Sequence, residues 1–272
     1  MKKILFVAFL SLLGMVNVQA QAGWEVGGWA GMSHYFGDLN TDYDLSKPGI
    51  AAGAVARYNF NTRLALKFNA SYGNVRATDA DSENAFELAR NLHFRSVVFD
   101  GTAQFEFNFL PYVHGSTDEW YTPYLFAGAS VFYFNPKAEY QDEWIELRPL
   151  GTEGQFKGEE YYTVQGGLAY GGGFKFSLSY RWSIDIEISS RVLFSDYLDD
   201  VSTVYADPDD LEAFRGPVAV ALADRSAELL DREPIGQAGR QRGDSSFNDS
   251  YTFVTVGVNY YFGNIKCPPL SR

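Results

Sequence analysis

The sequence predicts an all-β fold, an eight-stranded antiparallel transmembrane β-barrel with short periplasmic turns and long extracellular loops. Three observations lead to this fold class. Apolar and polar side chains alternate along eight extended segments, the connections between those segments are alternately short and long, and no later segment is apolar for long enough to span a membrane as a helix. Tyr, Phe and Trp also make up 17% of the chain, a high share for a soluble protein.

The first 20 residues have the features of a secretory signal peptide. Two lysines precede an apolar run from Ile4 to Val16, and small residues lead to Ala20. About 13 apolar residues fall short of the roughly 20 that a transmembrane anchor needs. Cleavage after Ala20 would remove both lysines and change the formal charge from −12 to −14. The expected organisation is therefore a signal peptide at 1–20, a barrel at 21–263 and a periplasmic tail at 264–272.

Eight segments carry the period-2 alternation that is typical of strands with one apolar face. The expected strands are 24–35, 50–60, 64–73, 95–109, 121–134, 162–179, 182–194 and 254–263. In the third, Leu64, Leu66 and Phe68 share one face, and Lys67 lies on the other. The fourth alternates over fifteen residues, longer than a typical globular strand of about 5–6 residues. The fifth alternates least clearly, which leaves its facing open.

The connections support a barrel over a soluble β-sandwich, the main alternative. Those after the second, fourth and sixth strands have about 3, 11 and 2 residues, and those after the other strands have about 13, 20, 27 and 52. Both chain ends of an even-stranded barrel lie in the periplasm, so the long connections are expected outside the cell. The 11-residue turn at 110–120 is long for a periplasmic connection and is a candidate partner contact.

Charged residues within the strands all fall on the polar parity, which a barrel directs into its lumen. Four cations and five anions nearly cancel, because unpaired charge in a confined interior is costly. We therefore expect an ion-pair network that plugs the lumen and leaves no pore. The predicted network consists of Glu25, Arg57, Lys67, Asp100, Glu106, Lys175, Asp185, Glu187 and Arg191.

Six segments together resemble the PorG-like outer-membrane barrels of the Bacteroidetes type IX secretion system. They are YFGDLN (35–40), RNLHFRSVVFDGTAQFEFNFLPY (90–112), FNPKAEY (134–140), LRPLGTEGQ (147–155), GGGFKFSLS (171–179) and DYLDDVSTVY (196–205). The resemblance implies a non-enzymatic component of a Gram-negative outer membrane, in contact with lipid. It also implies association with a periplasmic ring built from the PorK lipoprotein and the PorN protein, in support of protein secretion and, in some species, gliding. The alternative is a structural or adhesive OmpA-like or porin-like barrel that is not tied to secretion.

Glycine and acidic or amide side chains cluster where strands run into the long loops. We expect Gly37, Gly151 and Gly154 to adopt positive φ angles, and the polar side chains to bond backbone N–H groups and lock the loops over the barrel mouth. An exposed partner surface and a divalent-cation site are the alternatives for these motifs. The residues concerned are Gly37, Asp38, Asn40, Gly151, Glu153, Gln155, Asp196, Asp199 and Asp200.

Other motifs in the loops point to simple structural roles. The acidic segments 79–84 and 206–210 lack the spacing of a calcium loop and are read as solvated. Residues 218–230 could form a short helix, and the RGD sequence at 242–244 is read as chance. Cys267 in the tail is a possible contact with a periplasmic partner through a mixed disulfide, with an idle tail as the alternative.

Composition also limits the function classes. The acidic balance argues against nucleic acid, which requires basic surface. Only His34, His93 and His114 could serve in a Ser/His/acid set, and no nucleophile elbow accompanies them. We therefore expect no enzymatic activity, no cofactor and no small-molecule substrate.

Overall fold

The structure is a computed structural model of the chain, and it describes residues 22–229 and 234–263. The predicted signal peptide and the predicted tail with Cys267 lie outside the described residues. The strands are β1 (Gly23–Phe36), β2 (Gly49–Asn59), β3 (Leu64–Thr78), β4 (His93–Asn108), β5 (Tyr121–Tyr140), β6 (Glu143–Glu146), β7 (Val164–Ser177), β8 (Trp182–Leu193) and β9 (Ser250–Tyr261).

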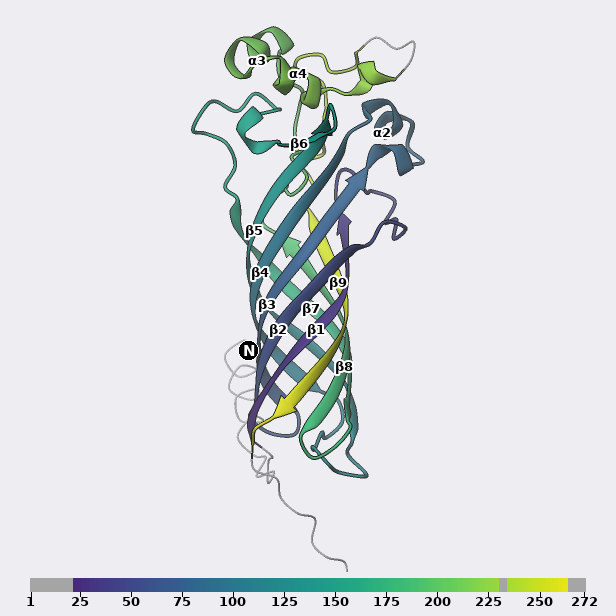
Figure 1. The fold of residues 1–272 in the computed structure, drawn as a ribbon, viewed down its shortest axis with the longest axis vertical. Helices are drawn as coiled ribbons and strands as arrows, with labels where there is room; N and C mark the ends of the chain where they lie inside the picture. The colour runs from purple at the N-terminus through teal and green to yellow at the C-terminus, as the bar shows by residue number, and fades with distance from the viewer. Residues whose placement is uncertain (1–21, 230–233, 264–272) are drawn as a thin grey trace, which may run out of the picture.

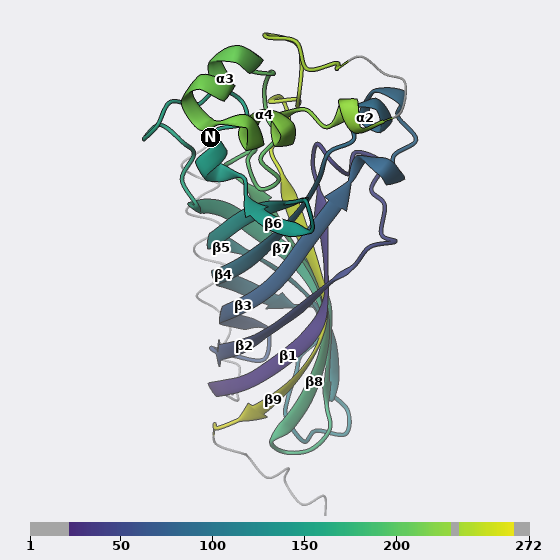
Figure 2. The ribbon, with the colours of Figure 1, turned by 45° about the horizontal axis from the view of Figure 1, so that its top comes forward.

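Eight of these strands form a closed antiparallel barrel, which confirms the predicted fold class (Figure 1). Each strand pairs with its neighbour along the chain, β5 pairs with β7, and β9 pairs with β1 to close the sheet. The register Glu25↔Tyr261 places the first and last strand ends at the same rim. Short turns join the strands at that rim, and the long connections lie at the opposite end, where Figure 2 shows them folded over the barrel.

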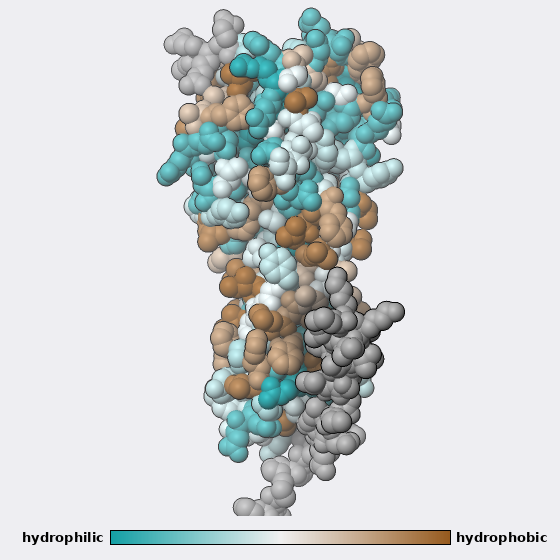
Figure 3. Space-filling view, turned by 180° about the vertical axis from the view of Figure 1, so that it is seen from behind, coloured by the Kyte–Doolittle hydropathy of each residue, from teal (hydrophilic) through white to brown (hydrophobic). Residues whose placement is uncertain are grey.

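Side chains alternate between the lumen and the exterior along every barrel strand. Phe105 and Ile186 point outward with exposed fractions of 71% and 47%, whereas Lys67 and Glu106 are buried inside. Apolar side chains form much of the exterior in Figure 3, with hydrophilic residues concentrated toward the ends. A closed barrel satisfies every backbone hydrogen bond without water, and its apolar exterior faces lipid. The chain is therefore an integral outer-membrane protein.

The fifth strand, whose facing the sequence left open, alternates as regularly as the others. Its inward residues include Tyr124, Phe126, Phe132 and Phe134, so both of its faces carry apolar groups. A hydropathy pattern cannot separate two such faces. Aromatic rings therefore fill part of the lumen that the sequence pattern alone could not assign.

Three strands extend by four or more residues beyond the expected bounds. β3 continues to Thr78, five residues past its predicted end at 73. β5 continues to Tyr140 and turns directly into β6 through Gln141 and Asp142, which have φ angles of 51° and 67°. Positive φ at both residues is the signature of a tight type I′ hairpin. The β5–β6 hairpin thus rises above the rim, within a stretch that the sequence assigned to a loop. β9 begins at Ser250, four residues earlier than predicted.

Short helical elements occupy the long connections. They are η1 (Asp79–Asp81), α2 (Ala85–Arg90), η2 (Arg148–Leu150), α3 (Pro208–Arg215), α4 (Pro217–Ala223) and η3 (Ser226–Glu228). The predicted helix at 218–230 is wrong in its extent, because α4 ends at Ala223. There the Asp224 carboxylate accepts hydrogen bonds from the backbone N–H groups of Ser226 and Gly236, which replace helical bonds. None of the helices in the described ranges has the length and apolar character to cross a membrane.

The interior divides into two layers along the barrel axis. The periplasmic half holds seven of the nine charged residues in the lumen. The extracellular half holds an apolar cluster that includes Tyr35, Phe94, Val98, Phe132 and Phe253 and continues into the loops through Leu39, Leu147, Leu198 and Leu222. We call the loops above this cluster, residues 37–48, 79–92, 141–163 and the described part of 194–249, the cap.

Candidate functional site: the filled lumen and its cap

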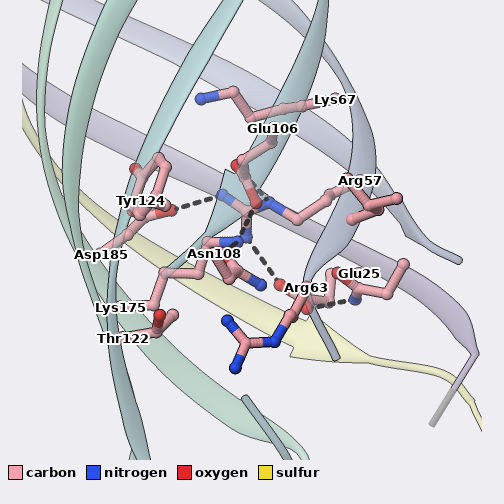
Figure 4. Close-up of polar contacts among 12 residues, drawn as sticks. Glu25, Arg57, Arg63, Lys67, Glu106, Asn108, Thr122, Tyr124, Lys175 and Asp185 are labelled. Atoms are coloured by element: carbon pink, nitrogen blue, oxygen red, sulfur yellow. Dashed lines mark hydrogen bonds and ion pairs between the residues drawn. The ribbon is translucent and has the colours of Figure 1, made fainter. Parts of the chain in front are cut away.

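Arg57 lies at the centre of the charged layer and is 1% exposed. Its guanidinium donates to carboxylates from three other strands, namely Glu25 at 2.7 Å, Glu106 at 3.1 Å and Asp185 at 3.1 Å (Figure 4). Strands β1, β2, β4 and β8 are thereby joined across the lumen by one side chain. A planar fork with five donors can satisfy three acceptors at once, which a lysine could not do with the same geometry.

Two lysines complete this layer. Lys175 pairs with Glu106 and donates to Asn108 Oδ1 at 3.2 Å, and Lys67 pairs with Glu187. Tyr124 donates its hydroxyl to Glu187 at 2.6 Å. Each buried ion therefore has a partner of opposite charge, as is required for charge in a low-dielectric interior.

A second charged pair lies higher in the lumen. Arg191 donates through Nε to Asp100 Oδ2 at 2.9 Å, and the Tyr251 hydroxyl donates to the same oxygen at 2.6 Å. Arg191 also stacks over the Phe253 ring, 4.5 Å from its centroid. With this pair, the structure places all nine of the charges that the sequence assigned to the lumen inside the barrel.

The periplasmic opening is filled by a turn that folds inward. His114, from the turn between β4 and β5, is buried, lies 3.0 Å from Glu25 Oε1 and stacks on Tyr261 with 4.4 Å between ring centroids. The sequence assigned His114 to a periplasmic turn but did not predict this insertion. A cavity of about 10 Å³ between Trp29, Lys67 and Glu187 is large enough for about one water molecule.

Two buried arginines join the loops of the cap. Arg90 binds Asp79 through two hydrogen bonds of 2.8 Å and donates to the backbone oxygens of Asp38 and Arg242. Arg242 donates to Glu153 Oε1 at 3.1 Å and to the backbone oxygen of Asp200 at 2.5 Å. Four loops that are far apart in sequence are thus connected through two guanidinium groups. Because Arg242 is 1% exposed, the RGD sequence does not present its arginine to solvent.

The polar loop residues singled out in the sequence lie in or beside this network. Glu153 accepts from the N–H groups of Ser202 and Thr203, and its own N–H donates to Gln155. Asp38 accepts from the Asp244 N–H, and the Asn40 amide donates to the carbonyl oxygens of Tyr35 and Asp44. Asp199 accepts from the Val201 N–H, and Asp200 accepts from the hydroxyls of Thr152 and Tyr161. Asp196 is buried near the same groups.

The prediction of positive φ holds for two of the three glycines. Gly151 and Gly154 have φ angles of 56° and 84°, but Gly37 does not have a left-handed conformation. Gly37 is needed for space instead. A Cβ atom there would lie 1.9 Å from Asp249 Oδ1 and 2.1 Å from Tyr35 Oη.

Tyr35, Asp199 and Asp249 form a buried acidic cluster beneath the cap. The Tyr35 hydroxyl oxygen lies 2.6 Å from Asp199 Oδ2 and 2.8 Å from Asp249 Oδ1. One hydroxyl proton can serve only one of these contacts, so the other requires a proton on a carboxylate. Burial raises the pKa of Asp249 to about 8. Burial also raises the pKa of Asp199 well above its usual value, and repulsion from the Asp249 carboxylate raises it further. At least one proton is therefore shared within the cluster at neutral pH.

The acidic segments considered for calcium have other contacts. The prediction that these segments are solvated is wrong for Asp79, which is buried and bound by Arg90. Asp207 caps α3 by accepting from the N–H groups of Asp209 and Asp210. Within the described residues, no group of three or more His, Cys, Asp or Glu side chains has a geometry suited to a metal ion.

A family model described as "Domain of unknown function (DUF6089)" matches residues 2–215. The chain belongs to the DUF6089 family. Three solved structures are similar to this DUF6089 protein: Neisserial surface protein A (12% identity, 88% of this chain and 97% of that chain, TM-score 0.44), OprG from Pseudomonas aeruginosa (11%, 90% and 98%, 0.42) and Ail from Yersinia pestis with the heparin analogue sucrose octasulfate (13%, 89% and 97%, 0.38). The comparison with curated proteins gives no match.

The chemical groups of this DUF6089 barrel are consistent with a structural role. The ions in its lumen are paired with one another, and two of its three histidines make polar contacts within the fold. His93 accepts from the Glu139 N–H at 3.0 Å, and His114 contacts Glu25. The charged side chains in the lumen therefore hold strands together, and the surfaces of the barrel and cap remain as the places where it can meet other molecules.

Proposed function

We propose that this chain is a non-enzymatic outer-membrane component of type IX secretion that anchors a periplasmic ring of PorK-like and PorN-like proteins. The observation that carries the proposal is the lumen, which is filled by the Arg57 and Arg191 ion pairs and by the inserted His114. A barrel without a passage acts through its outer surfaces. The six sequence segments shared with PorG-like barrels support secretion as the process that it serves.

The periplasmic rim is the surface that such a ring would contact. The turn between β4 and β5 is anchored there because His114 is held in the lumen, while Thr117 and Asp118 are exposed. A rigid turn with an exposed tip provides a contact that loses little conformational entropy on binding. Cys267 could add a covalent contact from the tail, and this stays a prediction.

Affinity capture from the native envelope tests this function. The tagged wild-type chain should recover a periplasmic ring lipoprotein, and Asp118→Lys should reduce that recovery by reversing the charge at the tip. Glu212→Lys reverses a charge on exposed α3 at the extracellular end and serves as the matched control. Recovery of no ring protein, together with intact secretion in a deletion strain, would overturn the proposal.

An adhesive barrel that is not tied to secretion is the second candidate. It is favoured by an extracellular groove of about 520 Å³, where Phe156 and Phe214 are exposed beside Leu211 and Arg215. Exposed aromatic side chains on a rigid surface are typical of binding sites. Under this function, Phe156→Ser with Phe214→Ser should reduce adhesion of whole cells to a surface and leave secretion unchanged.

A further inference from the structure

Three cations lie side by side in register on the outer faces of β3, β4 and β5. These strands are neighbours in the wall (Figure 1). The register pairs Arg76 with Arg95 and Arg95 with Lys137, and all three share the outward parity of their strands. Like charges directly opposite one another destabilise a sheet. Although the chain has a net charge of −12, these three cations face one another. They are therefore expected to have a negative group beside them that compensates their charge.

The protein itself compensates only part of this charge. Lys137 pairs with Glu146 at 3.0 Å, Arg95 stacks over the Trp144 ring at 3.6 Å, and Arg76 donates to the Pro48 carbonyl oxygen at 3.1 Å. Within residues 22–229 and 234–263, neither arginine has a carboxylate within 4.0 Å. Two guanidinium groups thus keep donors and positive charge directed away from the barrel.

The height of the row matches the lipid head groups of the outer leaflet. Four residues closer to the membrane centre on the same strands, the register aligns Tyr72, Phe99 and Tyr133 in a second outward row. Exposed aromatic rings of this kind mark the interface of a transmembrane barrel. Four residues correspond to about 13 Å along a strand and about 10 Å along the membrane normal at a tilt of about 40°. The cations therefore lie just outside the apolar belt.

A hollow in the lipid-facing surface lies below the aromatic row on β2, β3 and β4. It has a volume of about 550 Å³, and Ala52, Ala70 and Gly101 form its floor between the rings of Tyr72 and Phe99. Ala70 and Gly101 are directly opposite in the register, so two small residues lie side by side on the outer face. The hollow is shallow and open on its lipid side, so it offers a surface for an extended hydrocarbon chain to lie against. A hydrocarbon chain that descends from the cation row would reach this hollow.

We propose that the outer face of β2 to β5 binds an acylated, phosphate-bearing lipid of the outer leaflet, with its phosphate on Arg76, Arg95 and Lys137 and an acyl chain in the hollow. Charge complementarity identifies the head group, because guanidinium forks bind phosphate oxygens through paired hydrogen bonds. The hollow identifies an acylated molecule as the occupant and distinguishes it from a free anion. This site lies outside the lumen, and it does not depend on a role in secretion.

Binding to the purified full-length barrel in detergent tests the head-group contact. Titration should show tighter binding of diphosphorylated lipid A than of its dephosphorylated form, measured by native mass spectrometry. Loss of each cation should reduce the affinity for the phosphorylated lipid by about fivefold. The double variant Arg76→Gln with Arg95→Gln should therefore reduce this affinity by about 25-fold. Lys157→Gln removes an exposed cation from a distant cap loop and should leave the affinity unchanged.

A second variant and a soluble anion distinguish a lipid from free phosphate. Gly101→Leu should fill the hollow and reduce the affinity for lipid A. The substitution is compatible with the fold, because a Cβ atom at this position would lie 3.9 Å from its nearest neighbour, the Val131 carbonyl oxygen. Inorganic pyrophosphate should compete only weakly with lipid A for the three cations. Heat-dependent gel mobility verifies that each variant is folded. The proposal would be overturned by equal binding of the two lipid A forms or by full affinity of the double variant. It would also be overturned if pyrophosphate competed as well as the lipid and Gly101→Leu had no effect.

Discussion

Replacement of Arg57 by Gln should destabilise the barrel strongly. Removal of one partner from a buried ion pair costs about 3–5 kcal/mol, because it leaves an uncompensated charge. Arg57 binds three carboxylates, but each of these keeps another donor. Glu25 retains Asn59, Glu106 retains Lys175, and Asp185 retains Asn259. The losses are therefore not summed, and we expect a decrease of about 3–5 kcal/mol in the free energy of unfolding.

Equilibrium unfolding in urea, followed by tryptophan fluorescence in lipid vesicles, measures this change. Arg181→Gln is the matched control, since Arg181 is exposed, and its side chain donates a hydrogen bond of 3.3 Å to the Tyr261 carbonyl oxygen and lies 5.7 Å from the centroid of the Tyr260 ring. A change below about 0.5 kcal/mol is expected there. Adding Glu25→Gln to the Arg57 variant removes one orphaned charge and should recover part of the loss. A decrease of less than about 1 kcal/mol for Arg57→Gln would refute the interpretation that these ions are desolvated.

Three further outcomes follow from the interior and the cap. The purified barrel should give no stepwise ionic conductance in planar bilayers, and stable single-channel currents would show that the lumen is open. The pKa of Asp249 is raised to about 8, and that of Asp199 is also raised. The stability that these two carboxyl groups contribute to the folded cap is therefore complete below about pH 4 and is lost as the pH rises through about 8. Hydrogen exchange at 196–203, corrected for intrinsic rates, should therefore increase between pH 6 and 9 in wild type but much less in Asp249→Asn; pH-independent protection would contradict the shared proton. Gly37→Ala should destabilise the cap by about 1–3 kcal/mol through overpacking, whereas Gly101→Ala should have little effect, and equal melting temperatures of the two variants would exclude the predicted clash.

Alternation along the strands was sufficient to predict the barrel and the lumen-facing positions of its charged residues. A period of two assigns every residue of a strand to a face once one residue is placed, so Lys67 and Glu187 could be directed inward without knowing that they would meet. What alternation cannot provide is the stagger between strands that lie across the lumen. The three partners of Arg57 come from β1, β4 and β8, and only the closed register identifies them.

The cap was less predictable, because its contacts join loops that are far apart in the chain. The sequence assigns Asp199 to a motif that locks a loop and does not single out Asp249. Both are buried because Tyr35 brings them together from β1. Gly37 illustrates the same limit. Its neighbours in the sequence suggested a turn with positive φ, whereas the need for glycine comes from the side chain of Asp249, far along the chain, and from the hydroxyl of Tyr35 that contacts it.

The layered interior also argues against gating through the lumen. A passage would require separation of the Arg57 pairs in the lower layer and of the Arg191–Asp100 pair in the upper layer. At about 3–5 kcal/mol for each uncompensated partner, the two together cost about 6–10 kcal/mol, which corresponds to roughly one open molecule in 10⁴ to 10⁷. The apolar cluster and the cap lie above both pairs and would have to move as well. A partner that opened this barrel would need a comparable difference in affinity for the open state, so binding to its rim, cap or lipid face is the less costly way for it to act.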